Sequence, residues 1–211
     1  SSTHPPTPMM DVSEAHPIAQ QITRICQTLP TSVRLIAVSK NVSVTAMRIA
    51  YAVGIRDFGE SRIQEAEEKQ TQLKDLKEIT WHFIGHLQSN KVQKAIDRFQ
   101  WIHSVDSLKL AQRLDRLAES LYQPPKICLQ VKLLPDPNKH GWTVPELLAD
   151  LAALDQLTQI QICGLMIIPP AGLSDSETLA VFQQAQVLAE QIRSQVWRNL
   201  NIQELSMGMS G

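Results

Sequence analysis

Lys40 is the first residue whose type and position suggest chemistry. It directly follows an apolar run at 35–39, Leu-Ile-Ala-Val-Ser. An amine at the end of a buried strand loses part of its hydration, which lowers its pKa and makes the neutral form available to attack an aldehyde. The alternative is a solvated surface lysine, which is the commoner state of this residue type. Lys40 is therefore a candidate Schiff-base lysine, and both interpretations stay open here.

A second candidate site is the loop at 206–211, Ser-Met-Gly-Met-Ser-Gly. In parallel β/α barrels, phosphate groups commonly bind to backbone N–H groups in the loops after strands seven and eight. A Gly-containing turn without any ligand is the alternative interpretation. The loop predicts a phosphate site only if the strand before it is the seventh of such a barrel.

His82 and His86, the two histidines of the Trp-His-Phe-Ile-Gly-His segment, could be interpreted as a pair of metal ligands. On one extended strand they would be about 13 Å apart, because each residue advances the chain by about 3.3 Å. That separation is too large for both to bind one ion. We therefore expect His82 in the core or lining a pocket, and we expect no metal site.

Other catalytic signatures are absent from the sequence. It contains no G-x-G-x-x-G, no P-loop and no H-E-x-x-H, and the 208–211 segment does not have the spacing of a nucleophile elbow. Three carboxylates near predicted strand ends, Glu60, Glu65 and Asp106, are interpreted as helix caps or solvated first-turn charges. We therefore assign no catalytic residue.

Seven short apolar runs alternate with helical periodicity from residue 34 onward, a pattern typical of repeated β/α units around a parallel sheet. The predicted strands are Arg34–Ser39, Arg56–Gly59, Trp81–Gly85, Trp101–Ser104, Lys126–Lys132, Ile160–Ile167 and Glu204–Met207. Helix starts are predicted after Thr143 and Ser174, each with Glu three residues on. The pattern predicts a TIM-type (β/α) barrel of eight strands that lacks its last strand.

Composition narrows the class of protein further. The chain has 211 residues and a formal net charge of −1, so we expect no nucleic-acid partner. Its apolar runs are too short to cross a membrane, and its three cysteines have no C-x-x-C spacing, which favours reduced thiols and a cytoplasmic location. The proline-rich start predicts a flexible extension over residues 1–16, with one barrel domain over 17–211 and an additional helix near 18–29.

Six motifs together resemble the pyridoxal phosphate homeostasis proteins, with the cyanobacterial members most similar. The motifs are Leu-Ile-Ala-Val-Ser-Lys (35–40), Arg-Asp-Phe-Gly-Glu (56–60), Trp-His-Phe-Ile-Gly with Leu-Gln-Ser-Asn-Lys (81–91), His-Ser-Val-Asp (103–106), Gly-Leu-Met (164–166) and Leu-Ser-Met-Gly-Met-Ser (205–210). The resemblance implies the alanine racemase N-terminal barrel (fold type III), with pyridoxal 5′-phosphate (PLP) held on Lys40. It also implies Met166 beside the ring, a phosphate cradle from Ser206, Met207 and Gly208, and Asn41 and His82 as neighbours of the pocket.

The function that the resemblance implies is PLP binding and supply in vitamin B6 homeostasis, with effects on amino-acid balance. The racemases and decarboxylases built on this barrel are similar to two-domain dimers, in which a second catalytic group approaches the cofactor. This chain has no residues to spare for such a domain, so we expect a monomer without turnover that exchanges PLP with client apoenzymes. The alternatives are a regulatory scaffold with incidental PLP and a PLP-dependent amino-acid enzyme. Family members continue past the last motif with a helix and a strand, so we expect a barrel that is incomplete at its C-terminal end.

Overall fold

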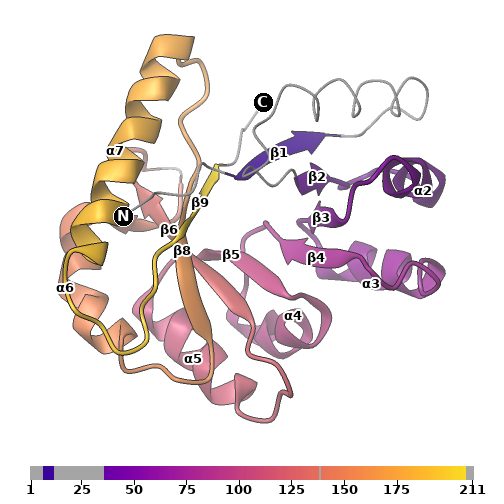
Figure 1. Ribbon diagram of the computed structural model, residues 1–211, viewed down its shortest axis with the longest axis horizontal. Helices are drawn as coiled ribbons and strands as arrows, with labels where there is room; N and C mark the ends of the chain where they lie inside the picture. Colours follow the sequence, from indigo (N-terminus) through magenta and orange to yellow (C-terminus); the bar gives the residue numbers. More distant parts are fainter. Residues whose placement is uncertain (1–6, 12–35, 138, 208–211) are drawn as a thin grey trace.

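Eight parallel strands pair in a closed ring in the computed structural model, which describes residues 7–11, 36–137 and 139–207. The pairing runs β1-β2-β3-β4-β5-β6-β8-β9, and β9 pairs back to β1. Six α-helices of the described residues lie around the strands (Figure 1). This is the predicted type of β/α barrel, but the expectation that one strand is missing does not hold, because eight strands close the ring. The carboxyl edge is where this fold places its functional groups.

All seven predicted strands are confirmed, with ends that differ from the prediction by at most two residues. The strands are β1 (Thr7–Asp11), β2 (Ile36–Val38), β3 (Asp57–Glu60), β4 (Thr80–Phe83), β5 (Trp101–Val105), β6 (Lys126–Lys132), β7 (Trp142–Thr143), β8 (Gln161–Ile167) and β9 (Glu204–Met207). The helices are α2 (Val44–Ala52), α3 (Ile63–Gln72), α4 (Val92–Arg98), α5 (Leu108–Ala118), α6 (Val144–Leu154) and α7 (Asp175–Arg193), with a 3₁₀ turn η1 (Ser89–Lys91).

Strand β1 lies between β2 and β9 in the ring, where no strand was predicted. Its backbone pairs in parallel with β2 (Met9 with Ile36) and with β9 (Thr7 with Ser206). The prediction that residues 1–16 form a flexible extension therefore does not hold for Thr7–Asp11. An unpaired edge on β2 and on β9 offers free N–H and C=O groups, and an extended segment can satisfy both edges at once. The predicted helix near 18–29 lies outside the described residues.

Both predicted helix starts are confirmed. The Thr143 hydroxyl accepts a hydrogen bond from the Glu146 N–H, and Ser174 forms a capping box with Glu177. These caps satisfy N–H groups that the first helical turn leaves without backbone partners. None of the helices in the described ranges is long and apolar enough to cross a membrane.

The barrel separates two cores of different size and character. The larger one is apolar and lies between the strands and the helices, where Phe58, Ile102 and Leu129 are fully buried. The smaller one is formed by Trp101, Cys128 and Met166, with Cys163 and Ile168 packed against it. Alternate residues of a strand point to opposite faces, so β5, β6 and β8 contribute to both cores.

Candidate functional site

Lys40 lies in the turn that follows β2, at the carboxyl edge of the barrel. Its side chain is exposed, and among the described residues none forms a hydrogen bond or ion pair with its ammonium group. From the sequence we expected the Lys40 amine to have lost part of its hydration. The exposed position of the side chain contradicts that expectation. The strand ends at Val38, so Lys40 stands beyond the buried run that precedes it. At this position the Lys40 amine is accessible to solvent and is not dehydrated.

The backbone around Lys40 is held in one conformation by three hydrogen bonds. Ser39 N–H donates to the Gly59 carbonyl of β3, and Val42 N–H donates to the Ser39 carbonyl, both at 2.9 Å. Asn41 has a φ of 60°, in the left-handed region that Asn tolerates better than most residues. Its N–H donates to Glu65 Oε2 at 2.8 Å. The residues on both sides of Lys40 are therefore fixed to the barrel and to α3.

A buried cluster of charges lies between this turn and α3. The Lys69 ammonium contacts Glu60 Oε2 at 3.1 Å and Glu65 Oε2 at 2.9 Å, and it also donates to the Ser39 carbonyl. The Ser39 hydroxyl donates to the Glu60 carboxylate. Glu60 is fully buried and Lys69 is 6% exposed. Each buried charge has an opposite charge and further hydrogen bonds, which is the arrangement that makes such burial tolerable.

The two carboxylates of this cluster have pKa values shifted in opposite directions. Burial raises the pKa of Glu60, because it disfavours the charged form more than the Ser39 hydroxyl and Lys69 favour it. For Glu65 the partial burial is outweighed by the Asn41 N–H and by Lys69, so its pKa is lowered. The carboxylate that holds the Lys40 turn is therefore the one that stays ionised more readily.

The lowered pKa of Glu65 predicts a pH-dependent contribution to stability. A depressed folded-state pKa means that the carboxylate stabilises the fold above its ordinary pKa of 4.5, and that this contribution is lost as the pH falls through the folded value. We expect Glu65→Gln to lower the free energy of unfolding by about 1–2 kcal/mol at neutral pH. Urea titrations of both proteins from pH 7 to pH 3 should show the difference shrinking at the acid end. A difference that is constant with pH would contradict this role.

A chain of hydrogen bonds crosses the interior of the barrel. Asp57 Oδ1 lies 2.7 Å from His82 Nε2, His82 Nδ1 lies 2.9 Å from His103 Nε2, and His103 Nδ1 lies 2.7 Å from Ser206 Oγ. The Trp101 ring stacks on both imidazoles, with centroids 5.6 and 5.7 Å away. A carboxylate oxygen only accepts, so His82 donates from Nε2. With both imidazoles neutral, His82 then accepts at Nδ1 from His103, and His103 accepts from the Ser206 hydroxyl. Four strands thus position Ser206.

Removing the Ser206 hydroxyl should leave the buried His103 Nδ1 without this donor. The loss of one such hydrogen bond costs about 0.5–1.5 kcal/mol, so we expect Ser206→Ala to lower the free energy of unfolding by that amount. Ser120→Ala, at an exposed position after α5, is the control and should change stability by less than about 0.5 kcal/mol. Equal urea midpoints for the Ser206 variant and the parent would disprove the role assigned to this bond.

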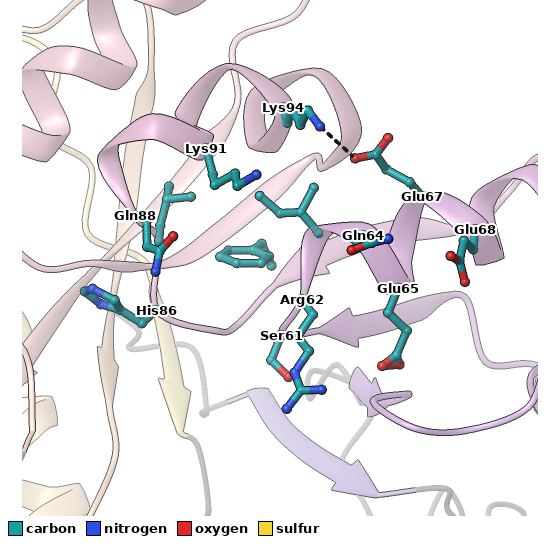
Figure 2. Close-up of a pocket in the computed structure, with 13 residues that line it drawn as sticks. Ser61, Arg62, Gln64, Glu65, Glu67, Glu68, His86, Gln88, Lys91 and Lys94 are labelled. Carbon is teal, nitrogen blue, oxygen red and sulfur yellow. Dashed lines mark ion pairs between the residues drawn. The ribbon is translucent and has the colours of Figure 1, made fainter.

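A groove of ≈ 870 Å³ lies outside the barrel, between the start of α3 and the η1–α4 segment (Figure 2). Its apolar lining is Ile63, Phe83 and Leu87, and Lys94 pairs with Glu67 across it at 4.0 Å. Neither Lys40 nor Ser206 is among the residues that line the groove. Glu65 lines the groove and also accepts from the Asn41 N–H, so the groove adjoins the turn that carries Lys40.

Comparison with known proteins decides the family. The family model described as "Alanine racemase, N-terminal domain" matches residues 15–211. A "Pyridoxal phosphate homeostasis protein" of Synechocystis is 51% identical over 187 residues, covering 89% of this chain and 85% of the relative. The chain belongs to the pyridoxal phosphate homeostasis protein family. A member from Escherichia coli is 33% identical over 204 residues, with 93% of this chain and 86% of the relative covered.

Solved structures agree with this membership in the pyridoxal phosphate homeostasis family. The structure of PipY of Synechococcus elongatus with PLP bound has 53% identity and a TM-score of 0.86, covering 92% of this chain and 89% of that chain. The same protein without PLP gives 55% identity and a TM-score of 0.87, covering 91% and 89%. An alanine racemase of Clostridium difficile, at 12% identity and a TM-score of 0.72, covering 95% of this chain and 51% of that chain, shares the fold. The predicted fold type is thereby confirmed.

The residues that the family resemblance singled out fall into two groups. Met166 and Ser206 are register partners on β8 and β9, both about 1% exposed, and Met207 follows Ser206 on β9. Lys40 and Asn41 lie after β2, which is separated from β9 by β1. His82 belongs to the interior hydrogen-bond chain that ends at Ser206. Gly208 lies outside the described residues, so the predicted cradle is described only as far as Met207.

Three residues beside the site were not predicted in their actual roles. Glu60 and Glu65 were interpreted as caps or solvated charges, but Glu60 is fully buried and Glu65 accepts from Asn41. Lys69 was not singled out at all. The one signal for them in the sequence is the four-residue spacing of Glu65 and Lys69 on a helix, which predicts an ion pair but not its burial.

Proposed function

We propose that this chain binds PLP covalently through Lys40 and acts in PLP homeostasis by holding and supplying the cofactor. The observation that carries the proposal is an exposed amine, without an ionic partner among the described residues, on a turn anchored to β3 and α3. It lies at the carboxyl edge of the barrel, where this fold places its functional groups. The family name and the PLP-bound PipY relative support the choice of ligand.

The donor set of the site fits the three chemical parts of PLP. An aldehyde requires a primary amine, and Lys40 provides one that is accessible. The aromatic ring requires an apolar neighbour, and the thioether of Met166 is of that kind. The phosphate requires hydrogen-bond donors, for which we propose the Ser206–Gly208 segment. When bound, the cofactor supplies an electron-withdrawing ring, and the protein supplies its position.

The described residues act on the site by fixing it in place. Glu65 and Lys69 hold the backbone on either side of Lys40, so the amine starts from a defined position. His103 accepts from the Ser206 hydroxyl and fixes its proton toward the barrel interior. The Ser206 oxygen keeps a lone pair for other donors but no proton to offer an anion. We therefore propose that backbone N–H groups of the 206–208 segment are the main phosphate donors.

A supply role explains the site better than turnover. Family members are named as homeostasis proteins, and this chain's described residues place no second acid or base against Lys40. We propose exchange of PLP with client apoenzymes, a monomeric state and a cytoplasmic location.

The test distinguishes transfer of PLP to another protein from catalytic turnover of amino acids. Protein loaded with PLP and freed of excess ligand by gel filtration is mixed with an apo-aminotransferase, and reactivation of the aminotransferase is followed. We expect the loaded protein to restore aminotransferase activity, and we expect D- and L-amino acids incubated with the loaded protein alone to be recovered unchanged. Steady conversion of an amino acid at ordinary enzymatic rates would assign an enzymatic function instead.

A further inference from the structure

We propose that His86, Asp106 and His140 form a binding site for a divalent transition-metal ion of the zinc type. Their side chains come from the loops after β4, β5 and β6, which are neighbours in the ring. One ligand atom from each lies within 4.8 Å of the other two. No metal site was expected from the sequence, because His82 and His86 cannot share an ion. His82 does belong to the interior hydrogen-bond chain, and the site proposed here pairs His86 with other residues.

The spacing of the three groups matches metal ligands better than a hydrogen-bonded cluster. Asp106 Oδ2 lies 3.6 Å from His86 Nδ1 and 3.8 Å from His140 Nδ1. Both separations exceed the roughly 2.7–3.2 Å of a hydrogen bond. Two ligands at about 2.0–2.1 Å from a tetrahedral zinc ion are about 3.4 Å apart. The carboxylate therefore already stands at nearly the required separation from both nitrogens.

The three side chains differ in mobility in a way that suits assembly around an ion. Asp106 is only 14% exposed and stands between the end of β5 and Ser107, the N-cap of α5. The two imidazoles are 47% and 59% exposed, so they can rotate to close the remaining separation. A fixed carboxylate with two adjustable imidazoles gives the site one rigid reference ligand.

The imidazoles themselves argue against a simple ion-pair cluster. Their rings stack face to face with centroids 3.9 Å apart and an interplanar angle of 15°. If Asp106 paired with two protonated imidazoles, two positive charges would be stacked in direct contact, which is unfavourable. Neutral imidazoles avoid that repulsion, and the neutral form is the one that binds metal. Because each nitrogen donates its lone pair in the plane of its ring, the two rings must turn out of the stack to share one ion.

The donor set selects the class of ion. Two imidazole nitrogens and one carboxylate suit zinc, cobalt, nickel or copper, whereas magnesium and calcium prefer oxygen ligands throughout. Three protein ligands leave one tetrahedral position for water or an anionic group. Figure 2 shows His86 at the end of the groove opposite Glu68, so the acidic residues of α3 are not part of the set. The site is also distinct from Lys40, which follows β2.

The test is a titration of tag-free, metal-stripped protein with zinc chloride, followed by calorimetry. We expect saturable binding of one ion per chain, weakened tenfold or more by each of His86→Ala, Asp106→Asn and His140→Ala. The matched control is His4→Ala/His16→Ala, which removes two histidines elsewhere in the sequence and should leave the affinity unchanged. Circular dichroism checks that every variant is folded.

A cobalt titration identifies the donors independently. We expect visible bands of a nitrogen- and oxygen-ligated Co²⁺ ion without the intense absorption of a cobalt–thiolate bond. The proposal is overturned if the parent shows no saturable one-to-one binding, if the three variants bind zinc as well as the parent, or if the cobalt spectrum shows thiolate ligation. PLP binding by Lys40 is measured separately and does not depend on any of these results.

Discussion

Replacing Lys40 with alanine should abolish retention of PLP while changing the free energy of unfolding by less than about 0.5 kcal/mol. The side chain is exposed, so its removal creates no cavity and leaves no buried group without a partner. Its amine is, in our proposal, the one covalent attachment point for the cofactor. The variant and the parent are incubated with PLP, passed through gel filtration, and compared by visible absorption per chain.

Lys91→Ala is the matched control for this experiment. Lys91 is an exposed lysine at the end of η1, on a loop that also follows a barrel strand. The control should keep the parent's visible absorption, because an ordinary surface lysine gives only adventitious adducts that gel filtration removes. If Lys40→Ala retained as much PLP as the parent, or if both variants lost the same amount, the assignment of Lys40 would be wrong.

Replacing Lys69 with methionine should have a large effect on stability, a loss of about 3–5 kcal/mol in the free energy of unfolding. Methionine keeps much of the side-chain length but leaves the fully buried Glu60 without its ammonium partner. The Ser39 carbonyl also loses a donor, so the backbone before Lys40 is less firmly held. Urea unfolding followed by circular dichroism gives the loss directly.

The double variant Glu60→Gln/Lys69→Met separates the charge effect from general disruption. It removes the uncompensated carboxylate, and we expect it to recover roughly half or more of the stability lost in the single variant. A double variant as unstable as Lys69→Met alone would show that packing around the lysine, and not the charge pair, accounts for the loss.

The strands were predictable because their burial leaves a direct mark on the sequence. The strands of a parallel barrel are covered on both faces, so Lys126–Lys132 is a short run dominated by apolar residues. Glu204–Met207 is half apolar, and both strands were predicted to the residue. Strand β1 was missed because Thr7–Asp11 has no such pattern. Its place follows from the unpaired edges of β2 and β9, which are distant in sequence.

The site was predictable where it depends on a strand end and not where it depends on side chains that meet across elements. The places of Lys40 after β2 and of Ser206 near the end of β9 follow from strand order, and their roles toward PLP are our proposal. The burial of Glu60 depends on Lys69 reaching it from α3, and the His86, Asp106 and His140 group depends on three loops converging. Spacing along the chain contains little information about such contacts. The hydration of Lys40 was predicted wrongly. It depends on how far the chain continues beyond the end of β2, which the sequence pattern does not show.

The most direct test of the central claim is to find which lysine carries PLP. The protein is mixed with one equivalent of PLP, reduced with borohydride to fix any covalent adduct, digested and mapped by mass spectrometry. The chain has ten lysines. We predict that the phosphopyridoxyl group is found on the peptide that contains Lys40 at nearly full occupancy. An adduct spread over several lysines, or concentrated on one other than Lys40, would contradict the account.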